Sequence, residues 1–255
     1  MTMTDDTAGT TPTPSTRATP AIPPIPEKRA ARARLAIVLD YDDLDAAVRV
    51  ARQVEPWFGI AKVGLELWSA AGRAAIERMQ DLGFAVFLDA KLHDIPNTVG
   101  SAARVLSRLG LGYLNAHAAG GTTMLRAFVD GAHAGAADAN VAPPCLLGVT
   151  VLTSDPDTGA FAARLQTAID AGCDGVVCSG HEVGAVRAGA ANLVTVVPGL
   201  RLAGSDAHDQ ARVMTPSEAI SAGADVLVIG RTVTQAADIA SAAARVHEDV
   251  VALLV

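Results

Sequence analysis

The feature that most constrains this sequence is a regular alternation of short apolar runs with longer amphipathic segments, beginning at residue 35. Short apolar runs bounded by turn residues indicate buried strands, whereas apolar residues spaced three and four apart indicate helices. Each interval between two runs is long enough for one helix. The expected strands are Leu35–Leu39, Ile60–Leu65, Ala85–Leu88, Tyr113–Ala116, Leu146–Leu152, Gly175–Cys178, Leu193–Val197 and Val226–Ile229.

Eight strand–helix pairs in about 220 residues match the size of a (β/α)8 TIM barrel. A doubly wound open sheet is the alternative, but it usually has fewer strands and often carries a glycine-rich nucleotide motif. The nearest candidate, Ala118-Ala119-Gly120-Gly121, does not fit Gly-x-Gly-x-x-Gly, and we find no Walker sequence. Several of the expected helices end at a glycine that can close them. All the expected helices are Leu44–Val54, Ala70–Leu82, Val99–Leu109, Met124–Ala136, Ala160–Ala171, His181–Ala188, Pro216–Ala222 and Ala236–Val246. The closing glycines are Gly83, Gly110, Gly172 and Gly223, each directly after the helix that it ends.

Residues 1–33 differ in composition from the rest of the chain. The first 26 residues hold six of the thirteen prolines and eight threonines but few large apolar side chains. Such a segment buries too little apolar surface to offset the entropy of ordering, so we expect a disordered tail. It has neither the apolar core of a signal peptide nor the arginine content of a transit peptide. We therefore expect one barrel domain over 34–255, with no run long enough to cross a membrane.

The charge and the cysteines limit the classes of function. The net charge is −7, and the tail is slightly basic, so the expected barrel is acidic. An acidic domain argues against non-specific binding of nucleic acid. Cys145, Cys173 and Cys178 are odd in number and have no Cys-x-x-Cys spacing, which indicates reduced thiols in a cytoplasmic protein.

Residues 84–100 contain the densest cluster of charge next to an apolar run. Asp89 and Lys91 follow Ala85–Leu88, and regular strand alternation would direct both side chains to the same face. Because Pro96 disfavours helix at the residue before it, Asp94 is expected in a loop just past the strand end. The sequence therefore predicts two carboxylates and an ammonium group at the carboxyl end of a buried strand.

A structural ion pair is the simpler interpretation of Asp89 and Lys91, but the distribution of lysines in the sequence favours a catalytic role. The chain has only three lysines, Lys28, Lys62 and Lys91, and otherwise uses arginine. The two outside the tail both fall in apolar, strand-like segments, where a compact and titratable charge is unusual.

Chemistry in a TIM barrel takes place at the carboxyl ends of the strands, and polar residues collect there. General polarity of strand ends explains some of them, but not lysines within apolar runs on two neighbouring strands. The polar residues at the strand ends are Asp40, Lys62, Asp89, Lys91, Asn115, His117, Thr150, Thr153, Ser154, Arg201 and Arg231.

The run Asp89-Ala-Lys-Leu-His-Asp-Ile-Pro-Asn-Thr98 resembles the signature of the orotidine 5′-monophosphate decarboxylase family. The resemblance extends over roughly 35–250. Further blocks follow in the family's order: Lys62-Val-Gly, Asn115-Ala-His-Ala-Ala-Gly-Gly, Gly148-Val-Thr-Val-Leu-Thr-Ser154, Val197-Pro-Gly-Leu-Arg201, Asp209-Gln-Ala-Arg-Val-Met-Thr-Pro216 and Val228-Ile-Gly-Arg231.

The resemblance implies loss of CO2 from orotidine 5′-monophosphate to give UMP, with no metal and no organic cofactor. It implies a catalytic array of Lys62, Asp89, Lys91 and Asp94, in which Lys91 protonates the carbanion at C6. Asp94, Ile95 and Thr98 would reach the neighbouring site of a homodimer. The implied substrate contacts are Asp40, Lys62 and Asp89, then Thr153 at the pyrimidine, and Arg201, Gln210, Gly230 and Arg231 at the phosphate. His93 and His117 are expected to be structural or to support the residues that contact the substrate.

Two rival functions remain. A keto-sugar-phosphate decarboxylase or pentose-phosphate epimerase on the related barrel would be the nearest, and the decarboxylases of that group bind Mg²⁺ with an acidic residue where this chain has Lys62. A catalytically silent barrel that binds a phosphate ligand is the other. The first is distinguished by sensitivity to a chelator, the second by binding without turnover.

Overall fold

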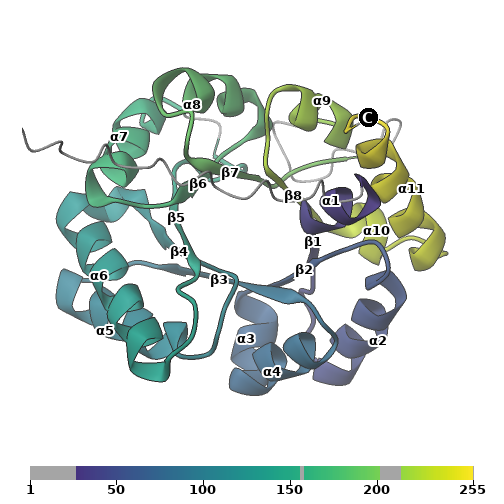
Figure 1. Cartoon of the computed structure of the whole chain (residues 1–255), viewed down its shortest axis with the longest axis horizontal. Coiled ribbons are helices and arrows are strands. Elements are labelled where there is room, and N and C mark those ends of the chain that lie inside the picture. The colour runs from purple at the N-terminus through teal and green to yellow at the C-terminus, as the bar shows by residue number, and fades with distance from the viewer. Residues whose placement is uncertain (1–26, 156–157, 202–213, 255) are drawn as a thin grey trace, which may run out of the picture.

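The computed structural model describes residues 27–155, 158–201 and 214–254, and it shows a closed barrel of eight parallel strands (Figure 1). Neighbouring strands pair in chain order, and β1 pairs with β8 in parallel, with Leu35 opposite Leu227. This last pairing closes the sheet and rules out the open-sheet alternative. The strands are β1 (Leu35–Val38), β2 (Ile60–Val63), β3 (Ala85–Leu92), β4 (Tyr113–His117), β5 (Cys145–Val149), β6 (Gly175–Val177), β7 (Val194–Val197) and β8 (Val226–Ile229).

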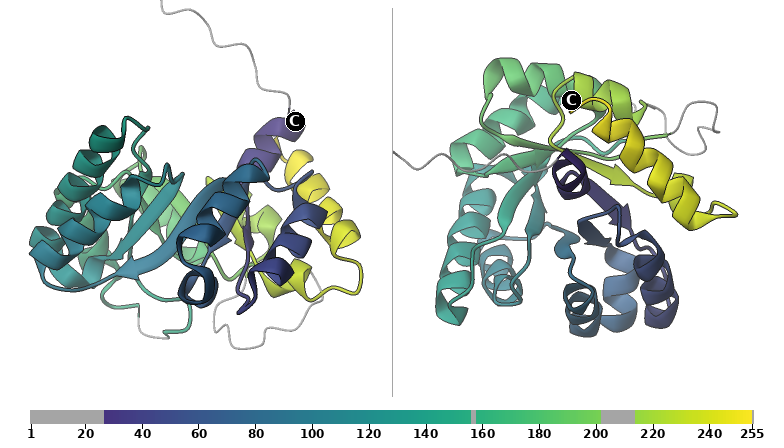
Figure 2. Two further views of the ribbon diagram at one scale, coloured as in Figure 1. Left: turned by 90° about the horizontal axis from the view of Figure 1, so that it is seen from below. Right: turned by 45° about the vertical axis from the view of Figure 1, so that its right-hand side comes forward.

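Helices cover the outside of the barrel, as Figures 1 and 2 show. The TIM-barrel prediction is therefore confirmed, with each of the eight expected strands present. The helices are α1 (Glu27–Ala33), α2 (Leu44–Val54), α3 (Leu65–Ala71), α4 (Arg73–Asp81), α5 (Pro96–Ser107), α6 (Gly121–Ala139), α7 (Phe161–Ala171), α8 (Val183–Gly189), α9 (Pro216–Ser221), α10 (Arg231–Thr234) and α11 (Ile239–Val251), with short 3₁₀ turns at Ala118–Gly120 and Gly180–Glu182.

Local signals in the sequence set several helix ends. Gly83, Gly110, Gly172 and Gly223 all have positive φ, the conformation that glycine adopts most readily. One expected helix, 70–82, is instead two helices. Gly72, with φ +50° and ψ −132°, separates α3 from α4, because this backbone conformation cannot continue a helix.

The strands are apolar on both faces because the barrel separates two cores. Along β8, Leu227 and Ile229 pack against the helices, while Val226 and Val228 face the barrel interior. The interior core also contains Ala36, Ile60, Phe87, Leu147 and Val196. These side chains fill the barrel and leave its carboxyl-end mouth available for polar groups.

The expected boundary of the tail needs a correction. Residues 27–33 form helix α1, which packs beside α11, whereas residues 1–26 lie outside the described residues. Ala31 is fully buried, and Arg32 donates to Glu55 at 2.8 Å. These contacts explain why 27–33 belongs to the barrel despite its neighbours' composition.

Candidate active site

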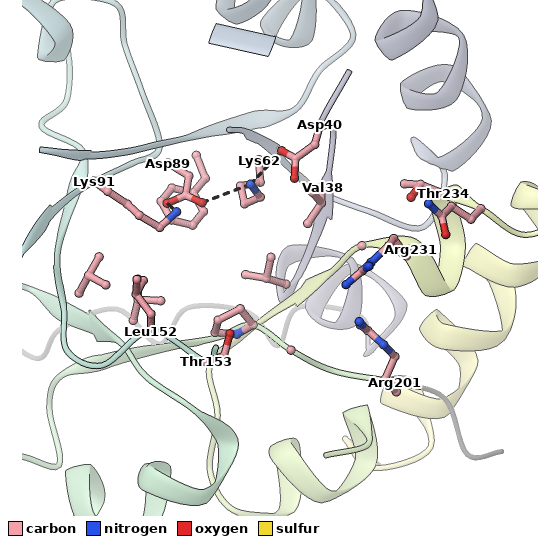
Figure 3. A pocket seen from close by; sticks show the side chains of 18 of the residues that line it. Val38, Asp40, Lys62, Asp89, Lys91, Leu152, Thr153, Arg201, Arg231 and Thr234 are labelled. Atoms are coloured by element: carbon pink, nitrogen blue, oxygen red, sulfur yellow. Dashed lines mark hydrogen bonds and ion pairs between the residues drawn. The ribbon is translucent and has the colours of Figure 1, made fainter. Parts of the chain in front are cut away.

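A cavity of about 560 Å³ opens at the carboxyl ends of the strands (Figure 3). The strand ends contribute most of its charged groups, as a TIM barrel requires. Its lining comprises Val38, Asp40, Tyr41, Lys62, Phe87, Asp89, Lys91, Val149, Val151, Leu152, Thr153, Val177, Pro198, Gly199, Arg201, Val228, Gly230, Arg231, Thr234 and Gln235.

Lysines and aspartates alternate along one side of this cavity. Lys62 Nζ lies 3.2 Å from Asp40 Oδ1 and 3.2 Å from Asp89 Oδ2. Lys91 Nζ lies 2.7 Å from Asp89 Oδ1. Figure 3 shows the chain of contacts from Asp40 through Lys62 to Asp89. The structure thus brings together four of the residues expected at the site.

Strand periodicity places these charges at the mouth. Ile60 faces the barrel interior, and Lys62, two residues further along β2, faces the same way. On β3 the same relation holds between Phe87 and Asp89. Each charged side chain therefore lies directly above the apolar layer that closes the barrel floor.

Asp89 is the most perturbed carboxylate of the array. Burial alone would raise its pKa, but Lys62 and Lys91, together with hydrogen bonds from Lys91 and Asn115, lower the pKa to about 2. Asp89 is therefore ionised at neutral pH, and its charge stabilises both ammonium groups beside it.

Lys91 does not continue a regular strand, contrary to the expected alternation. It has φ +48°, and the pairing of β3 with β4 shifts register between Leu88 and Leu92. Its side chain meets Asp89 because the chain bulges here, an arrangement common beside active sites. The predicted proximity of Asp89 and Lys91 is thus present, but by a different backbone route.

Asn115 contacts the charged array directly, although sequence reasoning assigned it no role. It is fully buried on β4, donates from Nδ2 to Asp89 Oδ1 at 2.7 Å and accepts from the backbone N–H of Lys91 at 2.7 Å. The signal was present, since an amide within the apolar run Tyr113–Ala116 must find partners when buried.

Two arginines lie on the far side of the cavity from Lys91. Figure 3 shows the guanidinium groups of Arg201 and Arg231 directed toward one another. Arg201 is buried, and its Nη1 donates to the carbonyl of Leu200 at 2.9 Å. Gly230 and Thr153 also line the cavity, whereas Gln210 lies outside the described residues. Paired guanidinium groups at the ends of β7 and β8 suit an anionic group such as a phosphate.

Three expected site residues do not line this cavity. Asp94 and Ile95 lie in the loop after β3, and Thr98 lies in the first turn of α5, which begins at Pro96. All three are exposed, and Ile95 has 65% of its surface accessible. Asp94 Oδ1 accepts from the N–H of Ile95 at 2.6 Å. Within one chain, therefore, Asp94 is not part of the charged array.

Two histidine rings lie next to one another near the array, and the three cysteines are free. The rings of His93 and His117 lie 5.6 Å apart, and burial, with nearby His93 and Lys91, lowers the pKa of His117. Burial raises the pKa of each cysteine thiol to about 12, which makes them unreactive. Over the described ranges, no three His, Cys, Asp or Glu side chains form a group that could hold a metal ion.

Comparisons with known proteins agree with this geometry. The sequence profile of the family described as orotidine 5′-phosphate decarboxylase / HUMPS matches residues 33–246. The chain is 46% identical to orotidine 5′-phosphate decarboxylase of Nitratidesulfovibrio vulgaris (strain DP4), with 87% of this chain and 99% of the relative covered. It is 43% identical to the enzyme of that name from Moorella thermoacetica, covering 86% of this chain and 93% of the relative.

A solved structure gives the same relationship. The crystal structure of orotidine 5′-phosphate decarboxylase from Lactobacillus acidophilus superposes with a TM-score of 0.73 at 31% identity, covering 85% of this chain and 98% of that one. The profile match spans most of the chain, and the relatives are covered almost from end to end. The chain belongs to the orotidine 5′-phosphate decarboxylase / HUMPS family.

Proposed function

We propose that this protein decarboxylates orotidine 5′-monophosphate to UMP and CO2, the last step of de novo pyrimidine synthesis. The observation that carries the proposal is the alternating array of Asp40, Lys62, Asp89 and Lys91 facing a cavity whose other side carries two arginines. The names of the relatives support the same substrate.

In this reaction the bond from C6 to the carboxylate carbon breaks, and its electron pair stays on C6. CO2 leaves, and a proton from Lys91 Nζ completes UMP. Lys91 is suited both to stabilise the carbanion and to protonate it, because Asp89 holds its ammonium group at 2.7 Å, inside the cavity. A fixed positive charge next to the developing carbanion needs no reorganisation during the reaction, and this kind of preorganisation usually gives the largest catalytic term.

The rest of the substrate would occupy the cavity between the two charged sides. Asp40 and Lys62 would bind ribose hydroxyls, and Thr153 would contact the pyrimidine. Arg201, Arg231 and the backbone N–H of Gly230 would hold the 5′-phosphate together with Gln210. The separation of the arginines from Lys91 across the cavity supports this orientation (Figure 3).

Completion of the array would require a second subunit. Asp94, Ile95 and Thr98 are exposed and lie outside their own cavity, which supports their donation to the neighbouring site of a homodimer. A mixture of inactive Lys91→Ala and inactive Asp94→Ala subunits would then regain activity, because one of the two sites in a mixed dimer is intact. Mixed dimers that stay inactive would contradict shared sites.

A cytoplasmic location fits the three free thiols, two of which are buried. Among the described helices, none has the length and apolarity needed to cross a membrane.

The Mg²⁺-dependent chemistry of the related barrels is the second candidate, and Lys62 argues against it. Its ammonium lies between the carboxylates of Asp40 and Asp89, 3.2 Å from each. A divalent cation bound between the same carboxylates would meet this positive charge directly.

The test follows the absorbance of orotidine 5′-monophosphate with purified protein, with and without EDTA. We expect turnover that the chelator leaves unchanged. Turnover abolished by EDTA and restored by Mg²⁺ would support the second candidate. Tight nucleotide binding without turnover would indicate a silent barrel.

A further inference from the structure

We propose that Asn115 is a positioning residue, whose carboxamide fixes both members of the Asp89–Lys91 pair from the neighbouring strand. The inference rests on the proposed function and names a determinant of that same site. Asn115 does not line the cavity, so any effect on the reaction must pass through the groups that it holds.

The bulge in β3 creates the need for such a residue. Leu88 pairs with Leu114 and Leu92 with Ala116, so β3 advances four residues while β4 advances two. The intervening segment of β3 contains both Asp89 and Lys91, and it lacks regular ladder pairing with β4. The backbone groups of such a segment need partners outside the ladder, and side chains can supply them.

Asn115 supplies the missing contacts in both directions. Its Oδ1 accepts the backbone N–H of Lys91 at 2.7 Å, and its Nδ2 donates to Asp89 Oδ1 at 2.7 Å. Lys91 is one of only two non-glycine residues with positive φ among those described, at +48°. Non-glycine residues persist in this conformation only where the surroundings hold them there.

The contact with Asp89 also fixes the direction of its carboxylate. Oδ1 receives Asn115 Nδ2 and Lys91 Nζ, both at 2.7 Å, which leaves Oδ2 for Lys62 at 3.2 Å. Asn115 can make both contacts because its amide carries a donor and an acceptor on one planar group. An apolar side chain of the same size would satisfy neither partner.

The experiment compares Asn115→Leu, which keeps the volume but removes the amide, with Gln80→Leu as a matched control. Gln80 also bridges backbone groups through its side-chain amide, to the carbonyls of Leu109 at 2.8 Å and Gly110 at 3.0 Å, away from the cavity. For each variant, kcat, KM, UMP affinity and thermal stability are measured. The carboxyl carbon of Asp89 is also titrated by NMR.

We expect Asn115→Leu to fold, to bind UMP within about threefold of the wild type and to lose about 10²-fold in kcat, because a misplacement near 1 Å has that order of effect. The pKa of Asp89 should rise in this variant, because its carboxylate loses a hydrogen bond. Gln80→Leu should lose stability while kcat stays unchanged. Wild-type kcat in Asn115→Leu, or a loss of kcat matched by an equal loss of UMP affinity, would overturn the proposal.

Asn115→Ser keeps the proposal testable if the leucine variant does not fold, because one hydroxyl group cannot reproduce both contacts. It should show a smaller fall in kcat in the same direction, and a wild-type kcat would refute the inference. A wild-type protein without turnover would instead refute the proposed function. The NMR titration would then decide on Asn115 alone, since an unchanged Asp89 pKa in the variants would overturn its positioning role.

Discussion

Gly64→Ala is the most informative small perturbation of the charged array. Gly64 follows β2, and a Cβ atom at this position would lie 2.8 Å from Lys62 Nζ and closer still to Asp40 Oδ1. The backbone here has φ −87° and ψ −176°, which any residue can adopt. The substitution therefore acts through steric contact with these two side chains rather than through backbone strain.

The expected magnitude follows from these distances. Ordinary contact begins near 3.4 Å, so the ammonium of Lys62 must move by about 0.6 Å, and the carboxylate of Asp40 by more. Misplacement near 1 Å costs about 10²-fold in rate. We therefore expect kcat/KM to fall by about 10- to 100-fold, equivalent to about 1.4 to 2.7 kcal/mol of transition-state stabilisation.

Folding should tolerate this change. The atoms that must move are the ends of flexible side chains, and the side chain of Asp40 is about half exposed. Gly184→Ala in α8 is the matched control, because its added Cβ would meet no atom within 4 Å. The control should keep wild-type activity and gain up to about 1 kcal/mol in stability. The assay is initial-rate decarboxylation of orotidine 5′-monophosphate, with thermal unfolding measured in parallel. A folded Gly64→Ala protein with wild-type kcat/KM would show that the rate does not depend on the spacing of Asp40 and Lys62, which would refute this reasoning.

Two further predictions concern the phosphate side and the ionisation of Asp89. Arg231→Ala should lower kcat/KM by a factor corresponding to a few kcal/mol, because binding energy from the remote phosphate is used at the reacting carbon; an unchanged value would remove Arg231 from the site. The pKa of Asp89 lies below its unfolded value, so its ionised form stabilises the fold above pH 4, and this stabilisation declines as the pH falls toward 2. The difference in unfolding free energy between the wild type and Asp89→Asn should accordingly decrease by about 1 kcal/mol from pH 7 to pH 3. Urea denaturation at each pH measures this difference. A difference that stays constant would contradict the depressed pKa of Asp89.

Much of the fold could be predicted because the strands are apolar on both faces and several helices end at a glycine. The expected helix Leu44–Val54 matches α2 at both ends, and Asp43 caps its start. Pro96 correctly predicted the loop at Asp94, but α5 begins at Pro96 itself, three residues before the expected start at Val99, because proline is favoured in the first turn of a helix. The division of the expected helix 70–82 could not be read from periodicity, because Gly72 breaks it through a backbone conformation that apolar spacing does not report.

The site was predictable to the extent that it depends on strand alternation. Asp40, Lys62 and Asp89 lie where a regular barrel would place them. Lys91 reaches the array only through the bulge in β3, which depends on pairing with β4 and on a buried amide. The buried amide of Asn115 is visible in the sequence, but its partner Lys91, 24 positions away, has no signature in local spacing.

In the proposed reaction, the ammonium of Lys91 stabilises and protonates the carbanion left by CO2. The most direct test of this role is Lys91→Ala, with kcat for orotidine 5′-monophosphate measured alongside the dissociation constant for UMP. We expect turnover to fall by many orders of magnitude while UMP still binds, because the arginines proposed to bind the phosphate, Arg201 and Arg231, are untouched. Turnover near the wild-type rate in this variant would contradict the account.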